Sequence, residues 1–332
     1  MRTQLISIGI AAGLDRIGFA AADPFPAVEE ELKRRNREGL SGRLGFTYND
    51  PAEATDVVQH FPWAETIVVG AKAYRPSSGA APASSGVVAA SARLPGYEPL
   101  RAALGQIKGA LLTAGQKAEV LCDDNRLVDR AAAVRAGVGW WGKNSMVLAS
   151  GLGPWILLGS VVTDLIVEPD PPLLRGCGTC SACLPACPTG ALIAPGVLDA
   201  RLCLAAWAQT PGVFPIELRR AMGNRLYGCD DCLDACPPGR LLKNQGSDDG
   251  LVFDLAWVLW ASDWTLLDAF GHWFLPNRDP RIIRRNALIA AGNSGDPKLV
   301  DSVAPYTSHP DPLLRTHAQW ALQELGRVPI GK

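Results

Sequence analysis

The chain has 332 residues, of which 48% are hydrophobic, so it can bury a large core in one large domain or in two to three smaller ones. Its formal net charge of −1 excludes a protein that is basic over its whole surface. A basic face balanced by acidic residues elsewhere is compatible with this charge, and nucleic-acid binding is therefore not excluded.

The first half of the chain alternates apolar strands with helical segments. Strands are predicted at Thr66–Ala71, Glu119–Cys122 and Trp155–Val162, because each is a short apolar run. Helices are predicted at Leu100–Ala114 and Val128–Ala136, between the strands. This alternation predicts an α/β or α+β domain in which helices cover a sheet.

Small and turn-forming residues divide the chain further. Residues 76–91 are rich in Ser, Gly and Ala and are expected to form a mobile loop. A proline-rich turn at 168–172 opens a cysteine-rich region. We therefore expect an α/β domain at 1–167, a ferredoxin-like domain at 168–245 and a helical domain at 246–332.

Eight of the nine cysteines have iron–sulfur spacing. The run Cys177–Cys187 has the C-x2-C-x2-C-x3-C-P spacing of bacterial ferredoxins. The run Cys229–Cys236 is one cysteine short, and Cys203 can supply the missing ligand. In two-cluster proteins the cysteine before the proline ligates the other cluster. The predicted sets are Cys177, Cys180, Cys183 and Cys236 for one [4Fe-4S] cluster, and Cys187, Cys203, Cys229 and Cys232 for the other.

Zinc sites and disulfides also use paired cysteines. Zinc ligands rarely occur as a triple followed by a fourth cysteine before proline, and disulfides need an oxidising compartment. The chain opens without a signal-peptide pattern and shows no membrane-spanning run, so we expect a cytosolic protein that transfers single electrons. Cys122 follows an apolar run and is expected to be a buried, inert thiol.

The tail is expected to be helical and weakly repetitive. Asp279 and Asp311 each precede a proline, the pattern of an N-cap followed by the first helical residue. Arg284 and Arg315 occupy equivalent places in the two helices. A HEAT-like repeat is predicted, and an ordinary helical tail is the alternative, because such repeats usually number three or more.

Polar residues after the second predicted strand form the candidate ligand site. Asp123 and Asp124 follow the strand directly, and a glycine-rich turn then carries Lys143, Asn144 and Ser145. Carboxylates at the end of a strand lie where α/β proteins bind ligands, and such a turn could hold phosphate through backbone amides. Helix caps and turns explain the same residues equally well.

Other cofactor sites lack support in the sequence. No G-x-G-x-x-G segment follows a strand and no P-loop is present. The four histidines are scattered and form no zinc or di-iron set.

Several longer motifs are spread over nearly the whole chain. They resemble those of the epoxyqueuosine reductases, the cobalamin-dependent iron–sulfur enzymes of tRNA modification. The segments that carry the resemblance are 13–19, 128–144, 158–164, 177–191 and 223–232.

The resemblance implies cobalamin as a cofactor in addition to the two clusters. It also implies that Asp123 is the catalytic acid, with Asp124 as a rival because the turn lacks the family's proline. Tyr97 stands where the family has a tyrosine lining the corrin, and the turn of Lys143 to Ser145 would add cofactor contacts. Glu98 and the segment 204–210 depart from the family pattern.

The activity implied by the resemblance is reduction of the epoxide of epoxyqueuosine to queuosine at the wobble position of tRNA. Cobalamin reduced through the clusters would open the epoxide, and an aspartate whose pKa is raised by burial would protonate the oxygen. The anticodon stem-loop would bind arginines on both sides of the cysteine-rich region, although such runs are often only solvated helix faces. These are Arg219, Arg220, Arg225, Arg281, Arg284, Arg285 and Arg315.

We further expect a monomer that receives electrons from a flavodoxin- or ferredoxin-like protein. Two other functions fit the same cysteine pattern. One is a corrinoid reductase of the reductive dehalogenase kind, and the other is a non-catalytic electron-transfer protein.

Overall fold

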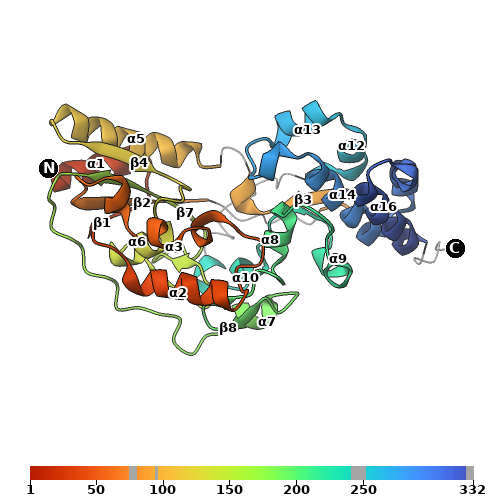
Figure 1. Ribbon diagram of the computed structural model, residues 1–332, viewed down its shortest axis with the longest axis horizontal. Coiled ribbons are helices and arrows are strands. Elements are labelled where there is room, and N and C mark those ends of the chain that lie inside the picture. Colours follow the sequence, from red (N-terminus) through yellow and green to blue (C-terminus); the bar gives the residue numbers. More distant parts are fainter. Residues whose placement is uncertain (75–80, 94–95, 241–251, 327–332) are drawn as a thin grey trace.

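The computed structural model describes residues 1–74, 81–93, 96–240 and 252–326. The N-terminal sheet and its helices form one half of the molecule, and the C-terminal helices form the other half (Figure 1). The cysteine-bearing elements lie below and between them. Within the described residues, every helix is too short or too polar to cross a membrane.

A four-stranded antiparallel sheet organises the N-terminal half. Its strands are β1 (Arg16–Ala21), β2 (Thr66–Ala73), β7 (Ile156–Thr163) and β4 (Ala118–Leu121), in the order β1-β2-β7-β4. Each neighbouring pair is antiparallel. The sheet therefore belongs to a mixed α/β fold without the parallel strands of doubly wound proteins.

Helices cover both faces of this sheet. The helices α1 (Arg2–Ala11) and α5 (Glu98–Thr113) pack with Val68 and Val161 on one face. The other face carries Ile67, Val69 and Val162, which pack with α6 (Asp129–Arg135) and with the short helix α4 (Val57–His60). Helix α3 (Pro51–Ala54) contacts α4. Side chains alternate between the two faces of a strand, so β2 and β7 are mostly apolar because both faces of the sheet are covered.

The three strands and two helices predicted in this region are confirmed, with small changes at their ends. The elements that were not predicted include α1, β1 and α2 (Pro26–Arg37). Helix α2 carries the basic run 33–37. Lys33, Arg34 and Arg35 of this run pair with glutamates one turn away, such as Lys33 with Glu29.

A second sheet corrects the prediction of a loop over 76–91. Strand β3 (Ser85–Val88) lies between β10 (Arg225–Tyr227), which is parallel to it, and β11 (Val252–Asp254), which is antiparallel. The small residues fit here because Leu226 packs where a side chain on Gly86 would stand. Residues 76–80 of the predicted loop lie outside the described residues.

Short elements position the cysteines. Helix α7 (Cys183–Ala186) lies within the first run, and the hairpin of β8 (Leu192–Ala194) and β9 (Val197–Leu198) follows that run. Helix α10 (Asp231–Asp234) carries Cys232 of the second run. Between the runs lie α8 (Leu204–Gln209), which begins after Cys203, and α9 (Ile216–Met222). The short two-stranded sheet of β5 (Trp140–Trp141) and β6 (Val147–Leu148) lies beside Cys236 in one apolar cluster.

The tail is helical, as predicted. It contains α12 (Leu255–Trp260), α13 (Asp263–Phe270), α14 (Arg281–Ser294), α15 (Val300–Val303) and α16 (Pro312–Leu325). Asp311 caps α16 by accepting the backbone N–H of Leu313, whereas the helical residues of α14 begin after Pro280. Helices α14 and α16 approach closely at Gly292, where a Cβ atom would lie 2.8 Å from the Cα of Ala321.

The tail shares one apolar core with α8, α9 and β10. The segment between the two cysteine runs is therefore fixed to the tail by burial of apolar side chains. The domain limits at 167 and 245, and the HEAT-like nature of the tail, stay predictions.

Candidate active site and cluster ligands

The structure brings four thiols of the first predicted set together. Cys183 and Cys236 are buried, whereas Cys180 is exposed. Burial raises the pKa of Cys236 to about 11, and Cys177, Cys183 and Cys180 are close enough to add to this effect. A group of thiols held in this way in apolar surroundings needs positive charge to become a group of thiolates.

The second predicted set is also brought together. Burial raises the pKa of Cys232, and the neighbouring Cys229, Cys203 and Cys187 raise it further. Burial likewise raises the pKa of Cys229 to about 12, although Arg225 acts against it. Arg225 itself pairs with Asp231 at 2.6 Å. The guanidinium of Arg225 therefore lies close to the thiols of the second set.

A single metal ion requires ligands that lie closer together than those of a cluster. Among the described residues, no three His, Cys, Asp or Glu side chains are spaced to hold one ion. In a [4Fe-4S] cluster each thiolate binds its own iron, so its ligands stand further apart than those of one ion.

Lys143 contacts the first cysteine loop. Its Nζ donates to the carbonyl oxygen of Gly178 at 2.8 Å and to Oγ of Ser181 at 3.3 Å. The carbonyl of Lys143 accepts the N–H of Gly196 from the β8–β9 hairpin. This residue, predicted as a cofactor contact, thus joins the N-terminal half to the cysteine-rich segment.

Asp123 lies two residues after the end of β4 in a left-handed conformation, with φ of +55°. Such a conformation is uncommon outside glycine and often marks a functional position. The side chain is accessible to solvent, yet protein atoms surround it closely enough that desolvation raises the pKa of its carboxyl, with Arg101 and Arg130 acting against the rise. This carboxyl can therefore hold a proton at higher pH than an ordinary aspartate.

The rival Asp124 has the opposite electrostatics. Both its oxygens accept hydrogen bonds from Arg126, at 2.9 and 2.7 Å, and these bonds lower the pKa of the carboxyl. Asp124 is therefore an ionised ion-pair partner, and Asp123 is the better proton donor of the two.

Further polar groups converge on Asp123. Tyr97 is largely enclosed by protein. Burial is the main cause of the raised pKa of its phenol, and the negative charges of Asp123 and Asp129 raise that pKa further. Burial also raises the pKa of Asp129, and Asp123 adds to the rise. Tyr227, on β10, also lies near Asp123. Burial is the main cause of the raised pKa of its phenol, and the charge of Asp123 adds to the rise. Sequence reasoning missed Tyr227, whose only signal is its position two residues before Cys229.

The buried polar atoms that lack a hydrogen-bond partner among the described residues include Oδ1 of Asp129 and Nδ2 of Asn144. Arg130 connects their two segments, because its Nη1 donates to the carbonyl of Ser145 at 3.1 Å and its charge acts on Asp123. Ser145 is also left-handed, with φ of +62°. An unpaired acceptor and an unpaired donor fit a polar ligand that offers both kinds of group.

The arginines predicted to bind RNA are mostly structural. Arg285 is fully buried and donates to the carbonyls of Thr210, Gly212 and Trp207. Arg219 and Arg284 are also buried, so the prediction that these three contact RNA is wrong. Of the remaining four, Arg225, Arg220 and Arg281 form ion pairs, and Arg315 bonds to backbone carbonyls.

The comparisons with known proteins cover nearly the whole chain. Residues 176–239 match the 4Fe-4S double cluster binding domain. The epoxyqueuosine reductase of Bacillus cereus is 32% identical over 354 aligned residues, which cover 100% of this chain and 91% of that protein. The enzyme of Bacillus subtilis is also 32% identical and is covered over 88% of its length.

Solved structures agree. An epoxyqueuosine reductase with an epoxyqueuosine-modified tRNA-Tyr stem loop superposes with a TM-score of 0.88 at 31% identity, over 98% of this chain and 90% of that chain. The Bacillus subtilis enzyme, with its catalytic aspartate loop swung out of the active site, gives a TM-score of 0.89 at 30% identity, with the same coverage. The resemblance inferred from the motifs is confirmed, and the chain belongs to the epoxyqueuosine reductase family of oxidoreductases.

Proposed function

We propose that this chain reduces epoxyqueuosine in tRNA to queuosine. The observation that carries the proposal is the raised-pKa carboxyl of Asp123, within a chain that matches epoxyqueuosine reductases over nearly its full length. Conversion of the epoxide to the alkene takes up two electrons and two protons and releases the oxygen as water. The protein must therefore supply electrons to a carbon and protons to an oxygen.

The proposed electron path uses both groups of thiols. Two [4Fe-4S] clusters on these thiols would supply single electrons, and cobalamin, which the family resemblance implies, would supply the strongly reducing centre next to the epoxide. The cluster domain match supports the first part. We propose that the enzyme works in the cytosol with a flavodoxin- or ferredoxin-like donor.

Residues around Asp123 fit the polar rim of a corrinoid. The corrin carries peripheral amides, which both donate and accept hydrogen bonds. The unpaired Oδ1 of Asp129 can accept from such an amide, and the unpaired Nδ2 of Asn144 can donate to one. Tyr97 would line the same site with its ring. These three residues would hold the cofactor beside Asp123.

Asp123 supplies the proton in this proposal. When the carbon–oxygen bond of the epoxide breaks, negative charge develops on the oxygen, and a neutral carboxyl within hydrogen-bond reach can donate to it. Desolvation by the surrounding protein atoms raises the pKa of this carboxyl and keeps it protonated at higher pH than usual, and Arg101 and Arg130 stabilise the carboxylate that forms.

The test uses protein purified without oxygen and reconstituted with iron, sulfide and cobalamin. With a chemical reductant and tRNA carrying epoxyqueuosine, nucleoside mass spectrometry should show loss of one oxygen atom from the modified base. Asp123→Asn is the control, because it should keep both cofactors but form little product. Absence of product from the fully loaded wild-type protein would refute the proposal.

A further inference from the structure

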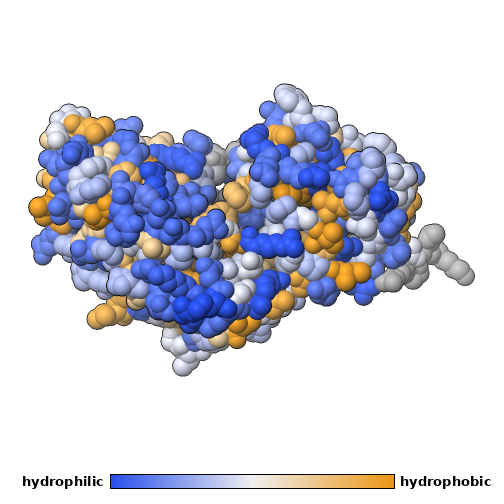
Figure 2. All heavy atoms as spheres, viewed as in Figure 1, coloured by the Kyte–Doolittle hydropathy of each residue, from blue (hydrophilic) through white to orange (hydrophobic). Residues whose placement is uncertain are grey.

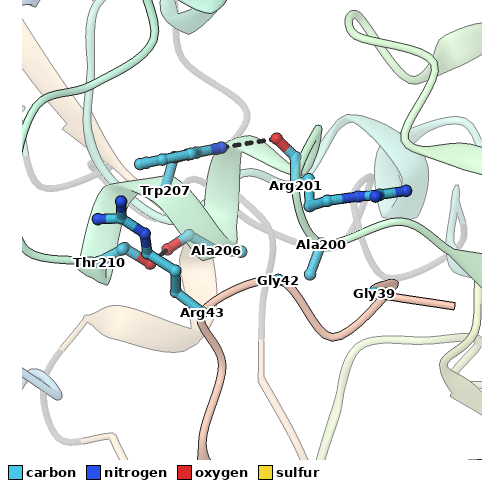
Figure 3. Close-up of a pocket in the computed structure, with 8 residues that line it drawn as sticks. All are labelled: Gly39, Gly42, Arg43, Ala200, Arg201, Ala206, Trp207 and Thr210. Carbon is cyan, nitrogen blue, oxygen red and sulfur yellow. Dashed lines mark hydrogen bonds between the residues drawn. The ribbon is translucent and has the colours of Figure 1, made fainter. Parts of the chain in front are cut away.

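A pocket of about 350 Å³ lies between the segment 39–43 and helix α8. Its wall contains Trp207 and Arg201 from the cysteine-rich segment and Arg43 from the N-terminal half (Figure 3). Gly39 and Gly42 form the opposite side, both with positive φ. A volume of this size is within the range that holds one small-molecule-sized group.

The chemistry of the pocket favours a flat group that carries negative charge. The guanidinium of Arg43 lies over the indole of Trp207, 5.6 Å from the ring centroid (Figure 3). The indole is held in place, because its Nε1 donates to the carbonyl of Arg201 at 2.7 Å. A fixed aromatic ring and a guanidinium plane are the surfaces on which unpaired bases stack.

Arg43 also carries charge that the described residues do not balance. Its Nη1 donates to the carbonyl of Pro211 at 3.2 Å, and it forms no ion pair within the described ranges. Arg201, on the other wall, is already paired with Asp199 at 2.7 Å. A guanidinium has five N–H donors, so Arg43 retains donors and a full charge for an anion such as phosphate.

The pocket is connected to the catalytic carboxyl through a short series of contacts. Phe46, three residues after Arg43, packs on Phe274 with ring centroids 4.8 Å apart. The hydroxyl of Tyr227 donates to the carbonyl of Phe274 at 3.1 Å, and Tyr227 is close enough to Asp123 for that carboxyl to affect its pKa. On the face shown in Figure 2, hydrophilic side chains cover most of the N-terminal half of the molecule.

We propose that this pocket holds one unpaired nucleotide of the anticodon loop near the reacting one, with its base on the Arg43–Trp207 pair and its phosphate on Arg43. The inference rests on the proposed function, since the RNA is the substrate. It adds a second binding point on the loop, which would fix the direction in which the reacting nucleotide enters the site.

The first test removes bases from the RNA one at a time. A labelled anticodon stem-loop is titrated by fluorescence anisotropy with protein that carries both clusters, and each loop nucleotide in turn is made abasic. At one position, loss of the base should weaken binding to the wild type by about tenfold, as expected for one base–aromatic stack. The affinity of Trp207→Ala should not change when the base at that position is removed, whereas the affinity of Trp207→Phe should again decrease.

Matched controls separate this effect from damage to the protein. Trp264, which is 74% exposed on α13 and lies outside the pocket, should tolerate Ala without change. Arg43→Gln should lower the slope of log affinity against log salt by about 0.7, the value for one single-strand phosphate contact, and Arg37→Gln should not. Iron content is measured for every variant, because Trp207 lies close in sequence to Cys203.

The outcomes distinguish the pocket from the proposed function. The proposal for the pocket is overturned if two results are obtained together. The wild type and Trp207→Ala lose the same RNA affinity at every abasic position, and Arg43→Gln leaves the slope of log affinity against log salt unchanged. The proposed function stands in that case if the wild type still forms product. Failure of the wild type to bind the RNA overturns both proposals.

Discussion

Asp124 is held by Arg126 at 2.7 Å, while the adjacent Asp123 has no such cationic partner in hydrogen-bond contact among the described residues. The carboxyl of Asp124 is therefore kept ionised, whereas desolvation by nearby protein atoms raises the pKa of the Asp123 carboxyl. We predict that Asp123→Asn lowers turnover by about a hundred- to ten-thousand-fold, the usual effect of losing a general acid. Asp124→Asn should cost much less.

The pH dependence follows from the direction of the shift. Because the acid must be protonated, the rate should fall as pH rises through the raised pKa of Asp123. Single-turnover rates over a pH series, with cofactor spectra recorded for each variant, provide the measurement. If Asp124→Asn proves the slower variant, the assignment of the proton donor is wrong.

The cluster ligands give a second prediction. Cys203 is the only cysteine between the two runs, and it lies with Cys187 and Cys232. Cys203→Ala should reduce the iron content from about eight atoms to about four, since one cubane loses a ligand. Cys122→Ala is the matched control and should leave iron unchanged, because Cys122 is a buried thiol beside the sheet. Mössbauer spectra that show two intact clusters in Cys203→Ala would contradict the pairing.

Lys143 gives a third prediction. Its ammonium lies on the loop of Cys177 to Cys183 and acts electrostatically on Cys183. A positive charge stabilises the more negative, reduced form of a cluster, so Lys143→Met should make the potential of the first cluster more negative. Lys143→Arg keeps the charge and should restore much of the wild-type value.

The measurement is a redox titration followed by EPR, which reads the two clusters without turnover. The signal of the second cluster serves as the internal reference. An unchanged potential in Lys143→Met with full iron content would limit Lys143 to a purely structural link.

The sequence predicted what depends on local spacing. The cysteine sets could be predicted because ligand spacing is written directly in the chain, and β2 and β7 because their apolar runs are long. Helix α2 was missed because its charged residues left a narrow apolar face, of which only Leu32 is buried. The strand at Ser85–Val88 was missed because Ser and Gly disfavour strands, and only its two partner strands stabilise it there.

The main error of the sequence-based prediction was to place buried arginines on the surface. Arg219, Arg284 and Arg285 were assigned to a surface because arginine is rarely buried. Nothing local shows that three backbone carbonyls from residues 207–212 surround Arg285. Such contacts between distant segments depend on the tertiary fold, and they could not be found from one sequence.

The same buried region gives the last prediction, which concerns stability at acid pH. His317 is fully buried, and its Nε2 accepts the N–H of Phe214 while Nδ1 lies 2.7 Å from the carbonyl of Leu313. The ring is therefore neutral, with its proton on Nδ1. Burial lowers the pKa of His317 to about 4, and the nearby Arg219 and Arg285 contribute to the decrease.

In the unfolded chain the imidazole has its ordinary pKa of about 6.5, so the unfolded state binds the proton first as pH falls. The free energy of unfolding should thus decrease between pH 6.5 and 4, by about 3 kcal/mol in total, and should not depend on this group above pH 7. Urea unfolding followed by circular dichroism at several pH values measures the slope. His317→Gln should flatten that slope, whereas His309→Gln, at a partly exposed position, should not. Equal slopes for wild type and His317→Gln would show that other groups cause the acid sensitivity of the tail.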